Sequence, residues 1–100
     1  MNQSSDATAG SRIIVSVLGH DKVGIIAAVA NILSESNINI LDISQTILQE
    51  FFSMILIADM ENSKVDLATL KQLLAEKGEA LGGLRIDAQH EDVFRYMHRI

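Results

Sequence analysis

Cysteine is absent from the sequence, and the cationic side chains are few and scattered. The 100 residues include 8 lysines and arginines against 13 aspartates and glutamates, which gives a formal net charge of -5. Without cysteine there can be no disulfide, no thiol nucleophile and no thiolate ligand for zinc, which fits a reducing compartment. Nucleic-acid binding needs grouped lysines and arginines that meet the phosphates, so the scattered charges argue against a nucleic-acid partner.

Long apolar runs are absent as well. No run reaches the roughly 20 residues that a membrane-spanning helix needs. Residues 1–11 are small and polar, lack the apolar segment of a secretion signal, and show no periodicity. We therefore expect a disordered leader over residues 1–11, no membrane partner and a cytoplasmic location.

Apolar residues make up 48% of the chain, which is enough for one domain with its own core. Their spacing distinguishes strands, with a period of two, from helices, with a period of about 3.6. The predicted elements are a strand over 12–18, a helix over 22–35, strands over 38–49 and 51–60, a helix from about 63 to 77, and a strand over 84–89. Residues 90–100 carry apolar side chains at helical spacing and predict a short amphipathic helix as a C-terminal tail.

The apolar pattern also predicts the place of each strand in a sheet. Residues 12–18 and 51–60 are apolar on both faces, which is typical of central strands, whereas residues 84–89 alternate and favour an edge. Within residues 38–49 the alternation changes phase near Leu41 and Asp42, which predicts a β-bulge. The order of the elements predicts an α+β fold, the ferredoxin-like βαββαβ sandwich, with a four-stranded antiparallel sheet and two helices on one face.

Two helices leave the other face of such a sheet uncovered. Residues 12–18 and 51–60 would then present apolar side chains to water, which is rare on a soluble protein. Either the tail over residues 90–100 or a second subunit covers that face. The outer second strand offers a further route to pairing between copies. We expect a homodimer.

A polar turn over residues 19–26 (GHDKVGII) lies between the first strand and the first helix. Asp21 is predicted to be the N-cap, with its carboxylate accepting from the N–H of Val23 or Gly24. A helix start also suits a ligand carboxylate, and Gly24 would let a ligand approach the backbone closely. Asp21 would then meet an ammonium group, and Asn39 a polar tail. From these eight residues alone, a cap and a tight turn are favoured over a ligand site.

Nucleotide binding and catalysis are not supported by the sequence. Residues 19–24 have the glycine spacing that opens a phosphate-binding P-loop, but Ile25 and Ile26 stand where that loop needs lysine followed by serine or threonine. No serine has a paired histidine at a recognisable spacing, and Asp42 and Asp87 fall on separate strands. We therefore predict a non-enzyme that carries no cofactor.

The three histidines raise the possibility of a metal site. His20 stands alone in the sequence, and His90 and His98 are eight residues apart, with acidic residues near His90. Metal ligands on one face of a helix usually come three or four residues apart. Solvated or hydrogen-bonded histidines are therefore favoured over a metal site.

Together these features resemble the ACT domain, the small regulatory module of amino-acid metabolism. The resemblance covers residues 12–89. It includes the small stand-alone ACT proteins of uncharacterised function and, more distantly, the ACT repressor of glycine cleavage. The segments that carry it are 19–26 (GHDKVGII), 37–40 (NINI), 43–46 (ISQT) and 94–100, which ends in MHRI. One departure is Val23, where many ACT domains have proline, although valine can adopt the same first-turn conformation.

The resemblance implies that an amino acid or similar metabolite binds between two subunits, at the polar turn of one copy and the second strand of the other. The ligand-binding residues that it implies are Gly19, His20, Asp21, Val23, Gly24, Ile25, Asn39 and Ile40. The implied function is a regulatory module that senses a metabolite as a homodimer and signals to a partner protein. The alternative is a structural or interaction module of the same fold that binds no ligand.

Overall fold

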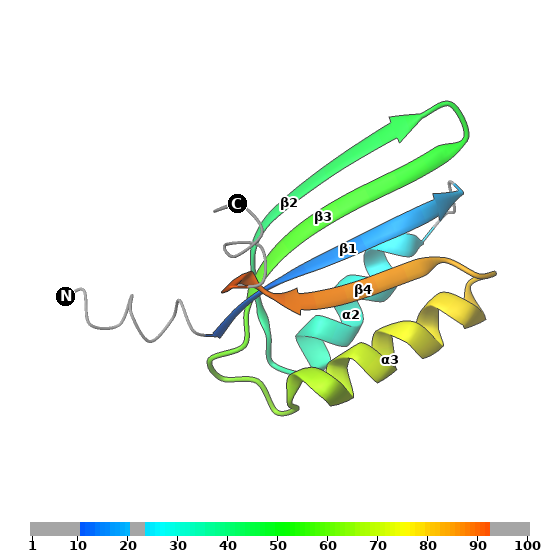
Figure 1. Cartoon of the computed structure of the whole chain (residues 1–100). Coiled ribbons are helices and arrows are strands. Elements are labelled where there is room, and N and C mark those ends of the chain that lie inside the picture. Colours follow the sequence, from blue (N-terminus) through cyan, green and yellow to red (C-terminus); the bar gives the residue numbers. More distant parts are fainter. Residues whose placement is uncertain (1–10, 21–23, 93–100) are drawn as a thin grey trace.

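The computed structural model describes residues 11–20 and 24–92 of the chain. Its elements are β1 (Arg12–His20), α2 (Ile25–Glu35), β2 (Asn39–Leu48), β3 (Phe51–Asp59), α3 (Leu67–Ala80) and β4 (Arg85–His90). The strands form one sheet in the order β2-β3-β1-β4, in which every neighbouring pair is antiparallel. Both helices lie on one face of this sheet (Figure 1). This arrangement confirms the predicted ferredoxin-like sandwich, with β1 and β3 central and β4 at an edge.

The core lies between the sheet and the two helices. Side chains alternate across a strand, so every second residue of β1 and β3 points toward the helices. The buried residues of this layer are Ile13, Val15 and Val17 from β1, Phe52, Met54, Leu56 and Ala58 from β3, Ile25, Val29 and Leu33 from α2, and Leu70 and Leu74 from α3. Burying a large aliphatic or aromatic side chain contributes about 1.5–3 kcal/mol, so this layer is the main source of stability.

Strand β2 contains the predicted bulge. Ile40 pairs with Ala58 and Asp42 pairs with Ile57, so Leu41 has no partner in the ladder between them. Beyond the bulge, the pairs on the helix side of the sheet are Ile43 with Leu56, Gln45 with Met54, and Ile47 with Phe52. The bulge therefore keeps Ile40 before it and Ile43 and Ile47 after it on the side that faces the helices.

Helix α2 begins at Ile25, three residues later than predicted. Its N-cap is Gly24, which has a left-handed φ of 89°, and none of the described side chains makes a capping hydrogen bond. The prediction that Asp21 is the N-cap is therefore wrong, although Asp21 itself lies outside the described residues. The reason is that β1 continues to His20, two residues beyond its predicted end, so the chain turns later. Glycine suits this turn because other residues rarely adopt a positive φ.

Helix α3 differs from its prediction at both ends. Its N-cap is Asp66, whose carboxylate accepts from the N–H of Thr69 at 2.9 Å. Ser63, the residue predicted to open the helix, instead makes a tight turn through its hydroxyl. The helix also runs through Gly78, its predicted stop, to Ala80. A β-carbon at Gly78 would lie 2.5 Å from the carbonyl oxygen of Leu84, so close packing accounts for this glycine.

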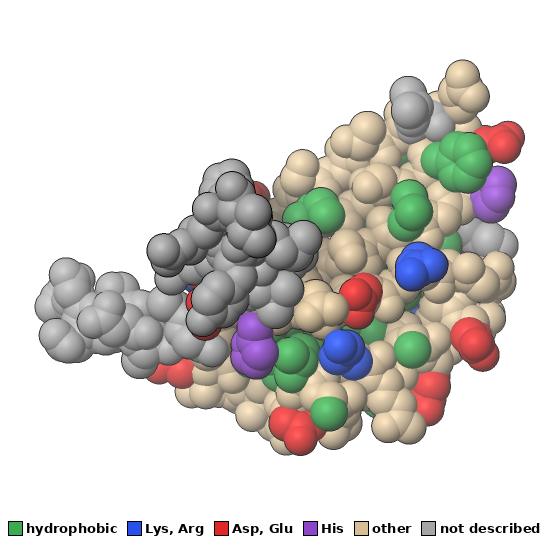
Figure 2. All heavy atoms as spheres, in the orientation of Figure 1, with side chains coloured by type: hydrophobic (Ala, Val, Ile, Leu, Met, Phe, Trp, Pro, Cys, Tyr) green, Lys and Arg blue, Asp and Glu red, His purple; other side chains and the backbone are tan. Residues whose placement is uncertain are grey.

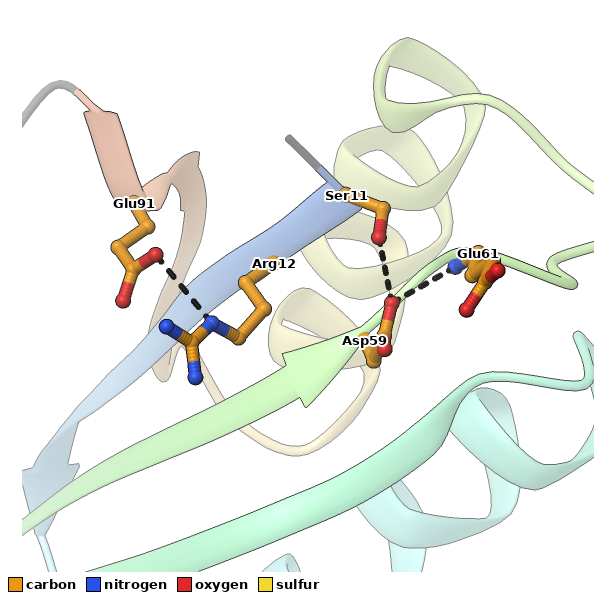
Figure 3. A network of polar contacts seen from close by, with 5 residues as sticks. All are labelled: Ser11, Arg12, Asp59, Glu61 and Glu91. Carbon is orange, nitrogen blue, oxygen red and sulfur yellow. Dashed lines mark hydrogen bonds and ion pairs between the residues drawn. The ribbon is translucent and has the colours of Figure 1, made fainter. Parts of the chain in front are cut away.

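Polar contacts hold the ends of the central strands (Figure 3). Asp59, at the end of β3, accepts from the Ser11 hydroxyl at 2.6 Å and from the Glu61 N–H at 2.9 Å. Arg12 Nε lies 3.3 Å from Glu91 Oε1. These two buried atoms make no hydrogen bond with the described residues, so the contact between them is an ion pair. The start of β1 is thus joined both to β3 and to the residue that follows β4.

The helix-free face of the sheet carries exposed apolar side chains. Leu18, Phe51 and Ile55 on this face are 52%, 49% and 42% exposed. Figure 2, in the orientation of Figure 1, shows hydrophobic side chains spread among charged ones on the side that it presents. Of the tail predicted over residues 90–100, His90 ends β4, and residues 93–100 lie outside the described residues.

Candidate functional site

A cleft of about 520 Å³ opens between the first turn of α2 and the second half of β2. It exists because the end of the β2–β3 hairpin stands away from the helices (Figure 1). The residues that line it are Gly24, Ile25, Ile26 and Ala27 on the helix side and Gln45, Ile47 and Phe52 on the sheet side. Two of the predicted ligand-binding residues, Gly24 and Ile25, therefore border a concave surface.

The start of α2 leaves backbone donors at the edge of this cleft. The first helical hydrogen bond runs from the Ala28 N–H to the Gly24 carbonyl at 2.9 Å. The N–H groups before it have no acceptor within the helix, as at every helix start, and no side chain in the described part of the chain caps them. A β-carbon added at Gly24 would meet nothing within 4 Å, so its φ of 89°, rather than a lack of space, requires glycine there.

The structure does not bring Gly19 and His20 into the cleft. Gly19 lies in β1, paired with Phe52, and a β-carbon there would collide with the side chain of Leu84. His20 stacks on Phe51, with ring centroids 5.1 Å apart and an interplanar angle of 28°. Because Phe51 and Phe52 are consecutive in a strand, they point to opposite faces of the sheet. His20 therefore lies on the face away from the cleft, while Asp21 and Val23 lie outside the described residues.

Asn39 and Ile40 lie at the other end of β2. They border a second, shallower cleft of about 370 Å³, which is lined by Ala30, Ser34, Asn37, Ile38, Asn39, Ile40 and Asn62. Within one chain the two predicted halves of the site are thus separate. The prediction that a facing subunit supplies Asn39 and Ile40 stays a prediction.

Sequence reasoning missed the sheet wall of the cleft. Gln45, Ile47 and Phe52 come from two strands, and their meeting with α2 depends on the register of the β2–β3 hairpin. One signal was available, because the change of phase near Leu41 puts Ile43 and Ile47 on one side of β2. If Ile47 had been paired with the buried residues of the third strand, the sequence would have placed Ile47 beside the first helix.

Polar and apolar side chains without charge line the described part of the cleft. No ionisable side chain is among the described residues that line it. Across the part of the chain that the structure describes, no group of three or more His, Cys, Asp or Glu residues gathers to hold a metal ion. The same residues contain no helix that is long and apolar enough to cross a membrane.

The fold and the cleft define a class of small α+β domains in which the turn before the first helix opens beside the second strand. The family model that matches is the ACT domain, over residues 11–88, and the chain belongs to the ACT domain family. It is similar to small proteins named UPF0237. One, from Methanocaldococcus jannaschii, is 54% identical over 90 residues, which cover 90% of this chain and 99% of that protein.

Solved structures agree with this family. An ACT domain protein from Streptococcus pneumoniae is 34% identical and has a TM-score of 0.73 over 85% of this chain and 94% of that one. A structure assigned as a glycine cleavage system transcriptional repressor has a TM-score of 0.68 at 16% identity, over 79% of this chain and 44% of that one. The second likeness shows the fold alone. The predicted resemblance to the ACT domain family is thereby confirmed, and the repressor shares the fold.

Proposed function

We propose that the chain is a non-catalytic regulatory module that binds a small α-amino acid or related metabolite between two copies of itself and signals to a partner protein. The observation that carries this proposal is the start of α2 at the edge of a cleft, where no described side chain caps the helix. A helix start attracts a carboxylate because its N–H donors and the positive end of the helix dipole act together. An α-amino acid supplies that carboxylate.

A second copy would supply the other half of the site. β2 lies at an edge of the sheet, so one side of its backbone has no strand partner among the described residues. In an antiparallel pair of such edges, the start of each strand lies beside the end of the other. Asn39 and Ile40 of the second copy would then face the wall made by Gln45 and Ile47. The Asn39 amide is suited to bind the polar end of the ligand.

The proposal assigns sensing rather than catalysis. Catalytic sites usually place titratable groups in their cleft, and the described residues that line this one include no ionisable side chain. A sensing module without a catalytic site acts through a partner, whose surface would read the difference between the free and the bound dimer.

A second candidate function is an interaction module of ACT fold that binds no ligand. The observation that favours it is the apolar helix-free face, where Leu18, Phe51 and Ile55 are exposed. Exposed apolar side chains that lie together often mark a protein–protein surface. In that case the open helix start would be only a consequence of the turn at Gly24.

Light scattering and ligand titration test the proposal together. The mass is measured at micromolar concentration, and the twenty amino acids are then screened by thermal shift and the responders titrated by calorimetry. We expect a dimer whose melting temperature rises with one or a few amino acids, because a ligand that binds only the folded state stabilises it. A monomer would contradict the shared site, and a well-folded dimer that responds to no amino acid would favour the interaction module.

A further inference from the structure

We infer that the cleft beside α2 binds an α-amino acid with an apolar side chain, for which leucine is the probe. This inference rests on the proposed function and adds the chemical class of the ligand. It is carried by the side chains that surround the cleft, and not by the helix start that borders it.

Hydrocarbon dominates both walls of the cleft. Ile25, Ile26 and Ala27 form the helix wall. Ile47, Phe52 and Gln45 form the sheet wall, and Gln45 is the one polar side chain among the described lining residues. Ile26 is 37% exposed and Ile47 is 58% exposed. An apolar ligand side chain between them would remove hydrocarbon of the ligand and of the protein from water at once.

No ionisable side chain is among the described residues that line the cleft, and this argues against an ionic ligand side chain. A carboxylate or ammonium group placed between Ile47 and Phe52 would lose its hydration without gaining an opposite charge. One amide, that of Gln45, can meet only a single polar group. Aspartate, glutamate, lysine and arginine are therefore disfavoured.

The size of the cleft argues in the same direction. Its volume of about 520 Å³ falls within the roughly 300–1,000 Å³ of small-molecule sites. Glycine or alanine would leave much of this space to water. A branched side chain can reach from the start of α2, where the carboxylate binds, to Ile47 on the opposite wall.

A series of ligands measures the contribution of the side chain. Calorimetry is performed on the full chain with glycine, alanine, norvaline and leucine, and with serine, aspartate and lysine as polar probes. Burial of one methylene contributes about 0.8 kcal/mol, which corresponds to about a fourfold change in Kd. We expect Kd to fall along the apolar series, with leucine at least tenfold tighter than alanine and aspartate and lysine the weakest.

Two variants of β2 test where the side chain lies. Ile47→Ser changes a residue that lines the cleft, whereas Ile43→Ser changes a residue on the same strand and face, 39% exposed, that does not line it. Both variants are first checked for folding, and their mass in solution is compared with that of the parent protein. We expect Ile47→Ser to raise the Kd for leucine at least tenfold and the Kd for glycine less than twofold. Ile43→Ser should change neither Kd by more than twofold.

The outcomes separate this inference from the proposed function. If serine, aspartate or lysine binds more tightly than leucine, or if the two variants weaken leucine equally, the apolar class is overturned while amino-acid binding stands. If no amino acid in the series binds to the folded dimer, the proposed function is overturned and this inference with it.

Discussion

The two helices of this sandwich occupy equivalent places in the two βαβ halves, yet they begin in opposite ways. Helix α3 starts at Asp66, which has an extended backbone and accepts from the N–H of Thr69. Helix α2 starts at Gly24, with a φ of 89° and no cap from a described side chain. A capped start uses its donors within the chain and adds stability, whereas a start without such a cap leaves its donors available. Under the proposed function, the start of α3 serves stability and the start of α2 serves binding.

The largest effect is expected from Gly24→Ala. Alanine has to adopt a left-handed conformation, which costs about 1–2 kcal/mol, so the free energy of unfolding in urea falls by about that amount. The matched control is Gly83→Ala, because Gly83 has a φ of 90° and an added β-carbon there also meets nothing within 4 Å. Both variants lose similar stability, but only Gly24→Ala loses the amino-acid response in thermal shift. An equal loss of response in both would show that the start of α2 has no special part in binding.

A smaller effect is expected from removing the cap of α3. Asp66→Ala deletes the acceptor of the Thr69 N–H and lowers the melting temperature by a few degrees, while Asp66→Asn keeps an acceptor and most of the stability. The rise in melting temperature caused by the bound amino acid stays the same in both. A changed ligand response in Asp66→Ala would mean that the two helix starts are not independent.

The smallest effect is expected from pH. The hydrogen bonds that the Asp66 carboxylate accepts from Thr69 lower its pKa from the ordinary value of 3.8. A lowered pKa in the folded state means that the stabilisation is present above pH 3.8 and is lost as the pH falls through the folded pKa. We expect the difference in melting temperature between the parent and Asp66→Ala to be constant near neutral pH and to shrink below about pH 4. A difference that grows on acidification would contradict the assigned cap.

The sequence predicted the fold well because the alternation of apolar residues is set by the same burial that holds the sheet together. Ile13, Val15 and Val17 could be assigned to one face before any tertiary contact was known. The helix ends were harder to predict. Asp21 and Ser63 both have side chains that can cap a helix. However, β1 extends two residues beyond the end that its apolar pattern predicts, and Asp66 rather than Ser63 is the N-cap of α3. Gly78 was misread because its close contact with Leu84 is invisible in the sequence.

The candidate site was predicted only in part. Gly24 and Ile25 could be placed through the resemblance to the ACT domain, since both lie in one local turn. His20 is among the ligand-binding residues that the resemblance implies, but its ring stacks on Phe51 on the face away from the cleft, because β1 continues through it. The sheet wall, Gln45 and Ile47, is assembled by hairpin register, which no local pattern specifies completely.

The bulge at Leu41 sets the polarity of the cleft. Side chains alternate between the two faces of the sheet before and after the bulge. At the bulge, the residues that face the helices change from even-numbered to odd-numbered positions. If the strand continued without the bulge, the helix side would receive Asp42, Ser44 and Thr46, and Ile43 and Ile47 would turn to the opposite face. The wall opposite α2 would then be lined by a carboxylate and two hydroxyls. One residue without a partner in the backbone ladder thus determines whether the wall of the cleft opposite α2 is apolar or polar.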